Sequence, residues 1–364
     1  MNNIIIFNAL QTSLSGGIGR YSYELSKQLY LKNPQNIKIV IRNEDMDLFD
    51  FAKKEDLIIA YNIQNSKSRN IYEQFKLPQL IHKEFPDAII HYPDSMAPLF
   101  ARNKVVITIH DLAFKSLKGV FTWKTVLWKN FMTRLSIRKA NKIIAITNFT
   151  KSELLKHYPR LDKQKINVVY NGFNDFSKDS INENNIRNEI RNLKNYILTV
   201  STISPRKNID TLIKAFDKVK NEVKDNLVIA GNNGWMYDKI YELVDKLNLK
   251  NRIIFTGKVN DDELKYLYKN SRIFTYISIY EGFGLPPLEA MSFNIPCIVS
   301  NTSSIPEVVG NYAMKVNPIK VENIADALIN LNREYYAKEI KEHLNKFSWN
   351  KCAQETYSVY KNIS

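Results

Sequence analysis

Short apolar segments alternate with segments of helical periodicity along almost the whole chain. Such apolar runs are typical of strands buried on both faces, and the segments between them place apolar residues at helical spacing. The alternation predicts parallel sheets with right-handed helical crossovers, and therefore a doubly wound α/β fold. The predicted strands of the first half cover residues 4–10, 37–41, 56–60, 88–92, 104–109, 142–147 and 166–170. Those of the second half cover residues 196–200, 227–230, 253–256, 273–277, 296–300 and 313–316.

A polar, asparagine-rich stretch at residues 171–195 separates the two sets of strands. It opens with Asn171-Gly172, which is a turn signal, and a new strand follows it. We therefore predict a first domain at residues 1–175 and a second domain at residues 176–346. The tail, residues 347–364, has a helical pattern in which Ser348 is a candidate N-cap.

The composition limits the classes of protein to which the chain can belong. Its 364 residues are enough for two domains with their own cores. Two cysteines, Cys297 and Cys352, cannot form a disulfide framework, and they favour a reducing, cytoplasmic compartment. No apolar run approaches the roughly 20 residues of a membrane-spanning helix, and residues 1–7 indicate a first strand rather than a signal peptide. The five histidines lack the spacing of zinc ligands.

Two carboxylates eight positions apart, Glu281 and Glu289, flank a turn rich in glycine and proline. The turn follows a predicted strand and precedes a helix-forming segment, so its backbone N–H groups and the helix N-terminus form a natural anion site. Ligands of open α/β sheets bind at the carboxyl edge of the sheet, where Glu281 is expected. Ordinary turn chemistry would also account for the glycines and prolines. The residues that form this carboxylate and glycine motif are Glu281, Gly282, Phe283, Gly284, Leu285, Pro286 and Glu289.

Two loops of the first half also follow predicted strands. The loop that contains Gly16 and Gly17 allows close backbone approach by a phosphate, although a plain strand–helix turn would look the same. It lacks the third glycine of a dinucleotide-binding fingerprint. His110-Asp111 follows the strand at 104–109. The imidazole of His110 can act as a neutral hydrogen-bond partner near pH 7, and Asp111 could either join the site or cap the next segment.

A pair of cations, Arg206 and Lys207, follows the first strand of the second half. Arginine offers a planar fork of donors and lysine a point charge, and together they suit a diphosphate. The alternative is that both side chains are simply exposed and solvated.

These motifs, in this order, resemble the retaining glycosyltransferases of the GT-B fold, in the family called GT4. The resemblance covers nearly the whole chain, from the glycine loop to a C-terminal helix that starts with Phe347-Ser-Trp349. It implies two Rossmann-like domains that face each other across a cleft. The N-terminal domain would bind the acceptor and the C-terminal domain the nucleotide-sugar donor, and residues 347–364 would form a helix that crosses back to the N-terminal domain.

The resemblance also implies roles for single residues. Glu281 would orient the donor sugar and stabilise an oxocarbenium-like state rather than act as a covalent nucleophile, and Glu289 would hold the ribose. The cations would neutralise the leaving diphosphate, and His110 would contact the donor sugar. The two glycine-rich loops would contact the donor. The residues assigned to the acceptor or the interdomain region are Asp111, Asn171 and Thr147, the last of which forms a Ser/Thr-x3-basic element with Lys151.

The donor that the resemblance implies is GDP-mannose, because the motifs look like those of bacterial mannosyltransferases of surface-polysaccharide assembly. A UDP-sugar-dependent transferase of the same fold is the alternative. We expect no metal and no other cofactor. Asp45-Met-Asp47 is the chain's Asp-x-Asp sequence, and it lies in a polar segment at a predicted helix start, not after a core strand.

Residues 112–142 contain eight basic residues and no acidic one. A basic and aromatic segment suits an anionic membrane surface, which favours a lipid-linked acceptor at the cytoplasmic face. Nucleic acid is a further candidate that we do not expect. A solvated helix face with its aromatic residues in the core is the structural alternative. The basic residues are Lys115, Lys118, Lys124, Lys129, Arg134, Arg138, Lys139 and Lys142, and the aromatic ones are Phe114, Phe121, Trp123, Trp128 and Phe131.

Other functions stay open on the sequence alone. A sugar-nucleotide epimerase or a phosphorylase would share the fold. A nicotinamide oxidoreductase is disfavoured by the incomplete glycine fingerprint. A non-catalytic protein that binds a membrane or nucleic acid would depend on the basic segment and could dispense with Glu281 and Lys207.

Overall fold

The computed structural model describes residues 4–13, 17–117, 119–331 and 340–363. Contacts divide the chain into two compact units, residues 1–172 with 347–364, and residues 173–346. The tail therefore packs within the first unit. The division falls three residues before the predicted boundary at residue 175, and the acceptor and donor labels of the two domains stay predictions.

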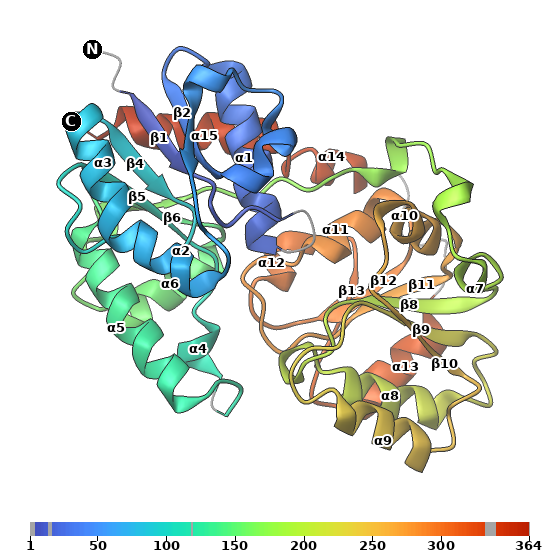
Figure 1. Ribbon diagram of the computed structural model, residues 1–364. Helices are drawn as coiled ribbons and strands as arrows, with labels where there is room; N and C mark the ends of the chain where they lie inside the picture. The colour runs from blue at the N-terminus through green and yellow to red at the C-terminus, as the bar shows by residue number, and fades with distance from the viewer. Residues whose placement is uncertain (1–3, 14–16, 118, 332–339, 364) are drawn as a thin grey trace. The chain divides into compact units, whose positions relative to one another are not determined.

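The first unit is built around a seven-stranded parallel sheet with the order β3-β2-β1-β4-β5-β6-β7 (Figure 1). Every strand overlaps its predicted range, so the predicted α/β class is confirmed. The strands are β1 (Ile5–Asn8), β2 (Ile37–Arg42), β3 (Leu57–Ala60), β4 (Ile89–Tyr92), β5 (Lys104–Ile109), β6 (Lys142–Ala145) and β7 (Ile166–Val168). The helices are α1 (Gly17–Lys32), η1 (Asn43–Phe49), η2 (Lys54–Asp56), α2 (Ser66–Ile71), η3 (Tyr72–Lys76), α3 (Leu77–Glu84), α4 (Ala113–Ser116), α5 (Trp123–Lys139), α6 (Asn148–His157), η4 (Lys163–Lys165) and α15 (Trp349–Lys361).

Helices cover both faces of this sheet, as Figure 1 shows. Successive strand residues point to opposite faces, so neighbours along β1 enter different cores. Ile6 packs in one hydrophobic cluster with residues of α3, α5 and α6. Ile5 and Phe7 pack in another cluster with residues of α1 and α15. Burial on both faces explains why the strands are continuously apolar rather than alternating.

The second unit has a six-stranded parallel sheet with the order β10-β9-β8-β11-β12-β13. Each strand again overlaps its predicted range, and α8, α9 and α13 share one hydrophobic cluster with one face of the sheet. The strands are β8 (Tyr196–Val200), β9 (Asn226–Ala230), β10 (Ile253–Gly257), β11 (Ile273–Tyr276), β12 (Cys297–Ser300) and β13 (Met314–Val316). The helices are η5 (Phe176–Lys178), η6 (Glu183–Asn185), α7 (Asn188–Arg191), η7 (Pro205–Lys207), α8 (Ile209–Val219), α9 (Asp238–Lys246), α10 (Asp261–Asn270), α11 (Leu285–Ser292), α12 (Ile305–Val309), α13 (Val321–Asn330) and α14 (Ile340–Leu344).

Helix α15 closes the first unit and explains the Asn171-Gly172 turn. Ser348 caps the helix, since its hydroxyl accepts a hydrogen bond from the Lys351 amide at 3.2 Å. A Cβ atom at Gly172 would lie 2.3 Å from the backbone nitrogen of Trp349. A side chain at position 172 would therefore displace the start of α15, so the glycine is needed for close packing.

Candidate active site

The strand order of the second unit reverses between β8 and β11, and the predicted cation and carboxylate loops meet at that point. The loop after β8 carries η7, which contains both cations, and the loop after β11 carries Glu281. The two loops are tied together because the Ile279 amide donates to the Arg206 carbonyl at 2.9 Å. Ligands of open α/β sheets bind at such a switch point, outside the carboxyl ends of the strands.

Glu281 lies between the two predicted cations. Lys207 Nζ is 2.6 Å from Glu281 Oε1, and Arg206 Nη1 is 3.2 Å from Glu281 Oε2. The hydroxyl of Tyr276 donates to the same Oε1 at 3.1 Å and accepts from Lys207 Nζ at 2.7 Å. The sequence-predicted residues Glu281, Arg206 and Lys207 thus form one hydrogen-bonded cluster, and the alternative of two solvated cations is wrong.

The electrostatics of this cluster favour an anionic ligand. Glu281 is 6% exposed, and burial alone would raise its pKa, but the charges of Lys207 and Arg206 outweigh burial and hold the pKa below its ordinary value. Glu281 is therefore ionised near neutral pH. Two cations facing one carboxylate leave a positive excess, which suits the oxygens of a phosphate group.

The glycine turn after Glu281 has its conformation fixed by hydrogen bonds. Ser304 donates from its hydroxyl to the carbonyls of Glu281 and Phe283, at 2.9 and 3.0 Å. Gly284 has φ 99°, and a Cβ atom there would lie 2.5 Å from Ile305 Cδ1. The position therefore requires glycine. Gly282 lies within the same turn, and Leu285 begins α11, so the predicted strand–turn–helix arrangement is confirmed.

Glu289 lies in α11, where the structure gives it a separate partner from Glu281. It is 5% exposed, and the hydroxyl of Tyr268 donates to its Oε2 at 2.9 Å. The ribose role of Glu289 stays a prediction.

His110 follows β5 in the first unit, as predicted. Its Nε2 donates to the Pro93 carbonyl at 2.8 Å, and its ring lies edge-on to Tyr21 with the centroids 4.7 Å apart. Burial lowers the pKa of His110, so the ring is neutral near pH 7. Because Nε2 carries the proton, Nδ1 is a hydrogen-bond acceptor, which is the chemistry that a sugar hydroxyl needs.

Among the other predicted residues of the first unit, Asp111 and Thr147 make local side-chain contacts, whereas Asn171 has an unsatisfied amide oxygen. Asp111 Oδ1 accepts from the Ala113 amide at 3.0 Å, a local contact at the start of α4, whose N-cap is Leu112, and the predicted role of Asp111 at the site stays a prediction. Thr147 is the N-cap of α6. Asn171 is 4% exposed, and its Oδ1 has no hydrogen-bond partner in the described part of the chain. Gly17 opens α1, whereas Gly16 lies outside the described residues.

The Asp-x-Asp sequence is confirmed at a helix start. Asp45 lies in the first turn of η1, where its two carboxylate oxygens accept from Arg42 at 2.7 and 2.8 Å. Within the described ranges, no group of three or more His, Cys, Asp or Glu residues could hold a metal ion.

The basic segment forms α4 and α5, and its aromatic residues divide into two groups. Phe114 is buried and Phe121 packs against the core, as the structural alternative expects. Trp123, Trp128 and Phe131 are instead 71%, 51% and 54% exposed. Lys118 lies outside the described residues. None of the described helices is both long enough and apolar enough to span a bilayer.

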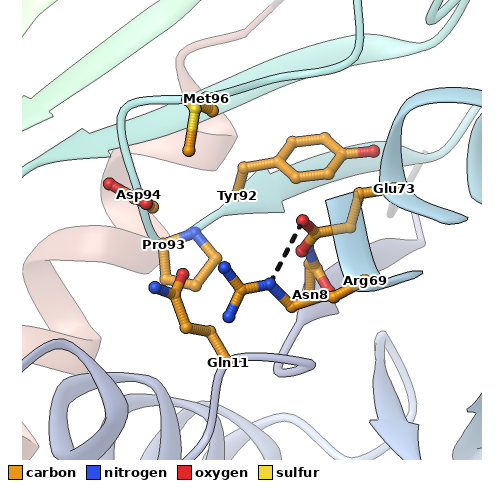
Figure 2. A pocket seen from close by; sticks show the side chains of 8 residues that line it. All are labelled: Asn8, Gln11, Arg69, Glu73, Tyr92, Pro93, Asp94 and Met96. Carbon is orange, nitrogen blue, oxygen red and sulfur yellow. Dashed lines mark hydrogen bonds and ion pairs between the residues drawn. The ribbon is translucent and has the colours of Figure 1, made fainter. Parts of the chain in front are cut away.

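Sequence reasoning missed a polar pocket at the carboxyl ends of β1 and β4 (Figure 2). Asn8 and Tyr92 end their strands, Arg69 and Glu73 lie four residues apart on a helical segment, and none of the four belongs to a motif identified in the sequence. The pairing of β1 with β4 brings them together, and this pairing joins segments some 80 residues apart in the sequence. The spacing of these residues in the sequence therefore does not indicate that they form a pocket.

Comparisons with known proteins agree with this arrangement. The family models Glycosyltransferase Family 4 and Glycosyl transferases group 1 match residues 15–175 and 180–349. The chain is 28% identical to O-antigen chain mannosyltransferase B of Escherichia coli, over 95% of this chain and 96% of that protein. It is 30% identical to the UDP-Gal:alpha-D-GlcNAc-diphosphoundecaprenol alpha-1,3-galactosyltransferase of Escherichia coli, over 79% and 77%. The crystal structure of Anabaena HepE in complex with UDP and glucose has the same fold, with a TM-score of 0.76, 18% identity, and coverage of 98% of this chain and 99% of that chain. The chain therefore belongs to the GT-B glycosyltransferases of group 1 and family 4.

Proposed function

We propose that this glycosyltransferase moves mannose from GDP-mannose to a glycan or lipid-linked acceptor in cell-surface polysaccharide synthesis. The full-length similarity to an O-antigen mannosyltransferase supports the sugar and the pathway class. The cluster of Arg206 and Lys207 around Glu281 is the observation that supports glycosyl transfer. Its two cations would supply positive charge where the diphosphate leaves.

The cluster also supports a proposed course for the reaction. Departure of a nucleoside diphosphate builds negative charge on phosphate oxygens, and preorganised cations stabilise that charge. On donor binding, Lys207 and Arg206 would exchange part of their contact with Glu281 for the diphosphate. The ionised Glu281 would then face the sugar and stabilise the positive charge of an oxocarbenium-like state. Transfer would retain the anomeric configuration and would need no metal.

A UDP-sugar donor is the second candidate, because the chain is also 30% identical to a galactosyltransferase that is named for UDP-Gal. A donor panel distinguishes the two. Purified protein would be mixed with GDP-mannose, UDP-galactose, UDP-glucose or ADP-glucose and with octyl glycoside acceptors, in EDTA. We expect transfer from GDP-mannose, and the NMR spectrum of the early product should show an α-linkage. Transfer from a UDP-sugar alone would replace the donor assignment, and isomerisation or phosphorolysis without transfer would replace the function.

We further propose that the exposed aromatic residues of α5 hold the enzyme on the anionic inner face of the cytoplasmic membrane. Trp123, Trp128 and Phe131 lie on the same helix as Lys124 and Lys129, and a helix that combines exposed aromatic and basic residues suits a lipid interface. Leu127 and Phe121 line an apolar groove beside them, with a volume of about 490 Å³.

Sedimentation with liposomes tests this surface. At low salt, wild-type protein should sediment with vesicles of phosphatidylcholine and phosphatidylglycerol and far less with phosphatidylcholine alone. The double substitution Trp123→Ser and Trp128→Ser should abolish most of the sedimentation. Trp235→Ser is the matched control, because Trp235 is an exposed tryptophan of the second unit. Equal recovery of wild type in the supernatant with both vesicles would contradict membrane binding.

A further inference from the structure

The strand order of the first unit reverses between β1 and β4, and a small polar pocket lies at this switch point (Figure 2). By its position it is the counterpart, within the first sheet, of the cation cluster within the second sheet. The function proposed above assigns no role to it. The residues that line it are Asn8, Gln11, Arg69, Glu73, Tyr92, Pro93, Asp94 and Met96.

An irregular helix supplies the charged residues of the pocket. Between α2 and α3, the turn η3 is π-helical, and it contains Glu73, with Arg69 four residues earlier in α2. Single π-helical turns inside α-helices recur at functional sites because they redirect side chains. Figure 2 shows that both side chains point into the pocket, towards Asn8 and the ring of Tyr92.

Asn8 and Tyr92 are buried, the side chains of Arg69 and Glu73 are 16% and 15% exposed, and two polar atoms of the pocket residues lack a hydrogen bond. Asn8 Nδ2 donates to Glu73 Oε1 at 2.6 Å, and Arg69 Nε lies 3.7 Å from Glu73 Oε2. Tyr92 is 1% exposed, and neither its hydroxyl nor Arg69 Nε makes a hydrogen bond within the described part of the chain. A buried polar atom without a hydrogen bond destabilises the folded state. Two such atoms beside one pocket therefore indicate a polar ligand.

The size and charge of the pocket identify the class of ligand. Its volume is about 10 Å³, which is roughly the room that one water molecule or one hydroxyl group needs. Glu73 lies beside the only guanidinium among the lining residues, that of Arg69, and Asp94 adds a second carboxyl group to the lining, so a phosphate would meet two carboxyl groups. A hydroxyl group both donates and accepts, and it can satisfy the guanidinium, the phenol and a carboxyl group at once.

The pocket also connects to His110. The carbonyl of Pro93, a residue of the pocket wall, accepts the hydrogen bond from His110 Nε2 at 2.8 Å. Pro93 therefore links the wall of the pocket directly to the imidazole of His110. We propose that Tyr92, Glu73 and Arg69 bind one hydroxyl group of the acceptor sugar and so determine which acceptor is used, an inference that rests on the proposed glycosyl transfer.

Steady-state kinetics with deoxygenated acceptors test this proposal. The probe is the octyl glycoside of mannose, galactose or N-acetylglucosamine that wild type uses best, together with its monodeoxy analogues. Wild-type transfer to the parent glycoside establishes the proposed function separately. Tyr92→Phe and Glu73→Gln preserve the shape of their side chains, and thermal unfolding checks that both variants fold. Tyr158→Phe is the matched control, because the Tyr158 hydroxyl is also buried without a hydrogen bond but lies outside the pocket.

We expect both pocket variants to raise the acceptor KM at least tenfold and the donor KM less than twofold. Wild type should reject one deoxy analogue, and Tyr92→Phe should lose much of that discrimination, because the partner of the missing hydroxyl is gone. Tyr158→Phe should match wild type. The proposal is overturned if both pocket variants keep the wild-type acceptor KM and deoxy profile, or if the donor KM rises as much as the acceptor KM.

Discussion

The two units place polar residues at the same topological position but with opposite charge. Between β8 and β11, Arg206 and Lys207 flank one carboxylate, Glu281. Between β1 and β4, a single Arg69 lies beside Glu73, with Asp94 in the same pocket. The doubly wound fold therefore provides the edge at which ligands bind, and a few side chains decide which ligand each edge suits.

Glu73 and Glu281 show how strongly neighbouring charges change the pKa of a carboxyl group. Both are largely buried, and burial alone raises the pKa of a carboxyl group. The pKa of Glu73 is raised to about 7, since one cation at 3.7 Å does not offset burial. The pKa of Glu281 is lowered, since two cations do. One edge is thus suited to an anionic diphosphate and the other to a neutral hydroxyl group.

Removal of a cation from the second unit should have the largest effect. Lys207→Ala should lower kcat/KM for the donor by about 10²–10³, because a preorganised charge at the leaving group is lost. Lys218→Ala is the control, since Lys218 forms an exposed ion pair with Glu322, and it should stay within twofold of wild type. If kcat/KM for the donor fell less than threefold in Lys207→Ala, the cluster would have no role in the mechanism.

Isosteric replacement of the two glutamates should shift stability in opposite directions at pH 8. In Glu281→Gln, the cations lose a buried carboxylate, which destabilises the fold by about 3 kcal/mol. Because the folded pKa of Glu281 is depressed, its contribution is present above its ordinary pKa of 4.5 and is lost as the pH falls through the folded pKa. The deficit of the variant should therefore shrink in acid.

For Glu73 the sign is reversed. Its folded pKa, about 7, exceeds the ordinary value of 4.5, so the folded state takes up a proton between these values and is favoured at lower pH. Glu73→Gln removes a buried charge and should raise the free energy of unfolding at pH 8 by about 2 kcal/mol, with little change at pH 5. Denaturant titrations at pH 5 and pH 8 measure the effect at Glu73, and titrations at about pH 3 and pH 8 measure the effect at Glu281, whose folded pKa lies below 4.5. If both substitutions changed the free energy of unfolding in the same direction at pH 8, the contrast between the two glutamates would be wrong.

A smaller effect is expected at Glu289. Glu289→Ala should raise the donor KM about tenfold with kcat nearly unchanged, because a hydrogen bond to the ribose would be lost from the ground state and the transition state alike. Tyr268→Phe, which removes the phenol that donates to Glu289, should have a weaker effect in the same direction. A normal donor KM in Glu289→Ala would exclude the ribose role.

Much of the second site could be predicted because its parts are local. A strand, a glycine turn and a helix leave clear marks in the sequence, so Glu281 and Lys207 could each be assigned to a strand end. Their 2.6 Å contact depends on the adjacency of β8 and β11, which the expected topology allowed.

The first site could not be predicted because it depends on long-range pairing and on an irregular helix. Asn8 and Glu73 are 65 residues apart, and the π-helical turn at 72–76 has no sequence signature. Local hydrogen bonds such as that from the Ala113 amide to the Asp111 carboxylate also depend on loop geometry that the sequence does not specify. Exposure was equally hard to predict, because the same aromatic pattern produced a buried Phe114 and an exposed Trp123.

Calorimetric titration of the donor diphosphate tests the central claim, that the second unit carries the anion site and the first unit does not. GDP would be titrated into wild type, Lys207→Ala and Glu73→Gln at pH 8, in EDTA. The account predicts that Lys207→Ala weakens binding at least tenfold and that Glu73→Gln binds GDP within twofold of wild type. Wild-type affinity in Lys207→Ala together with a large change in Glu73→Gln would contradict it.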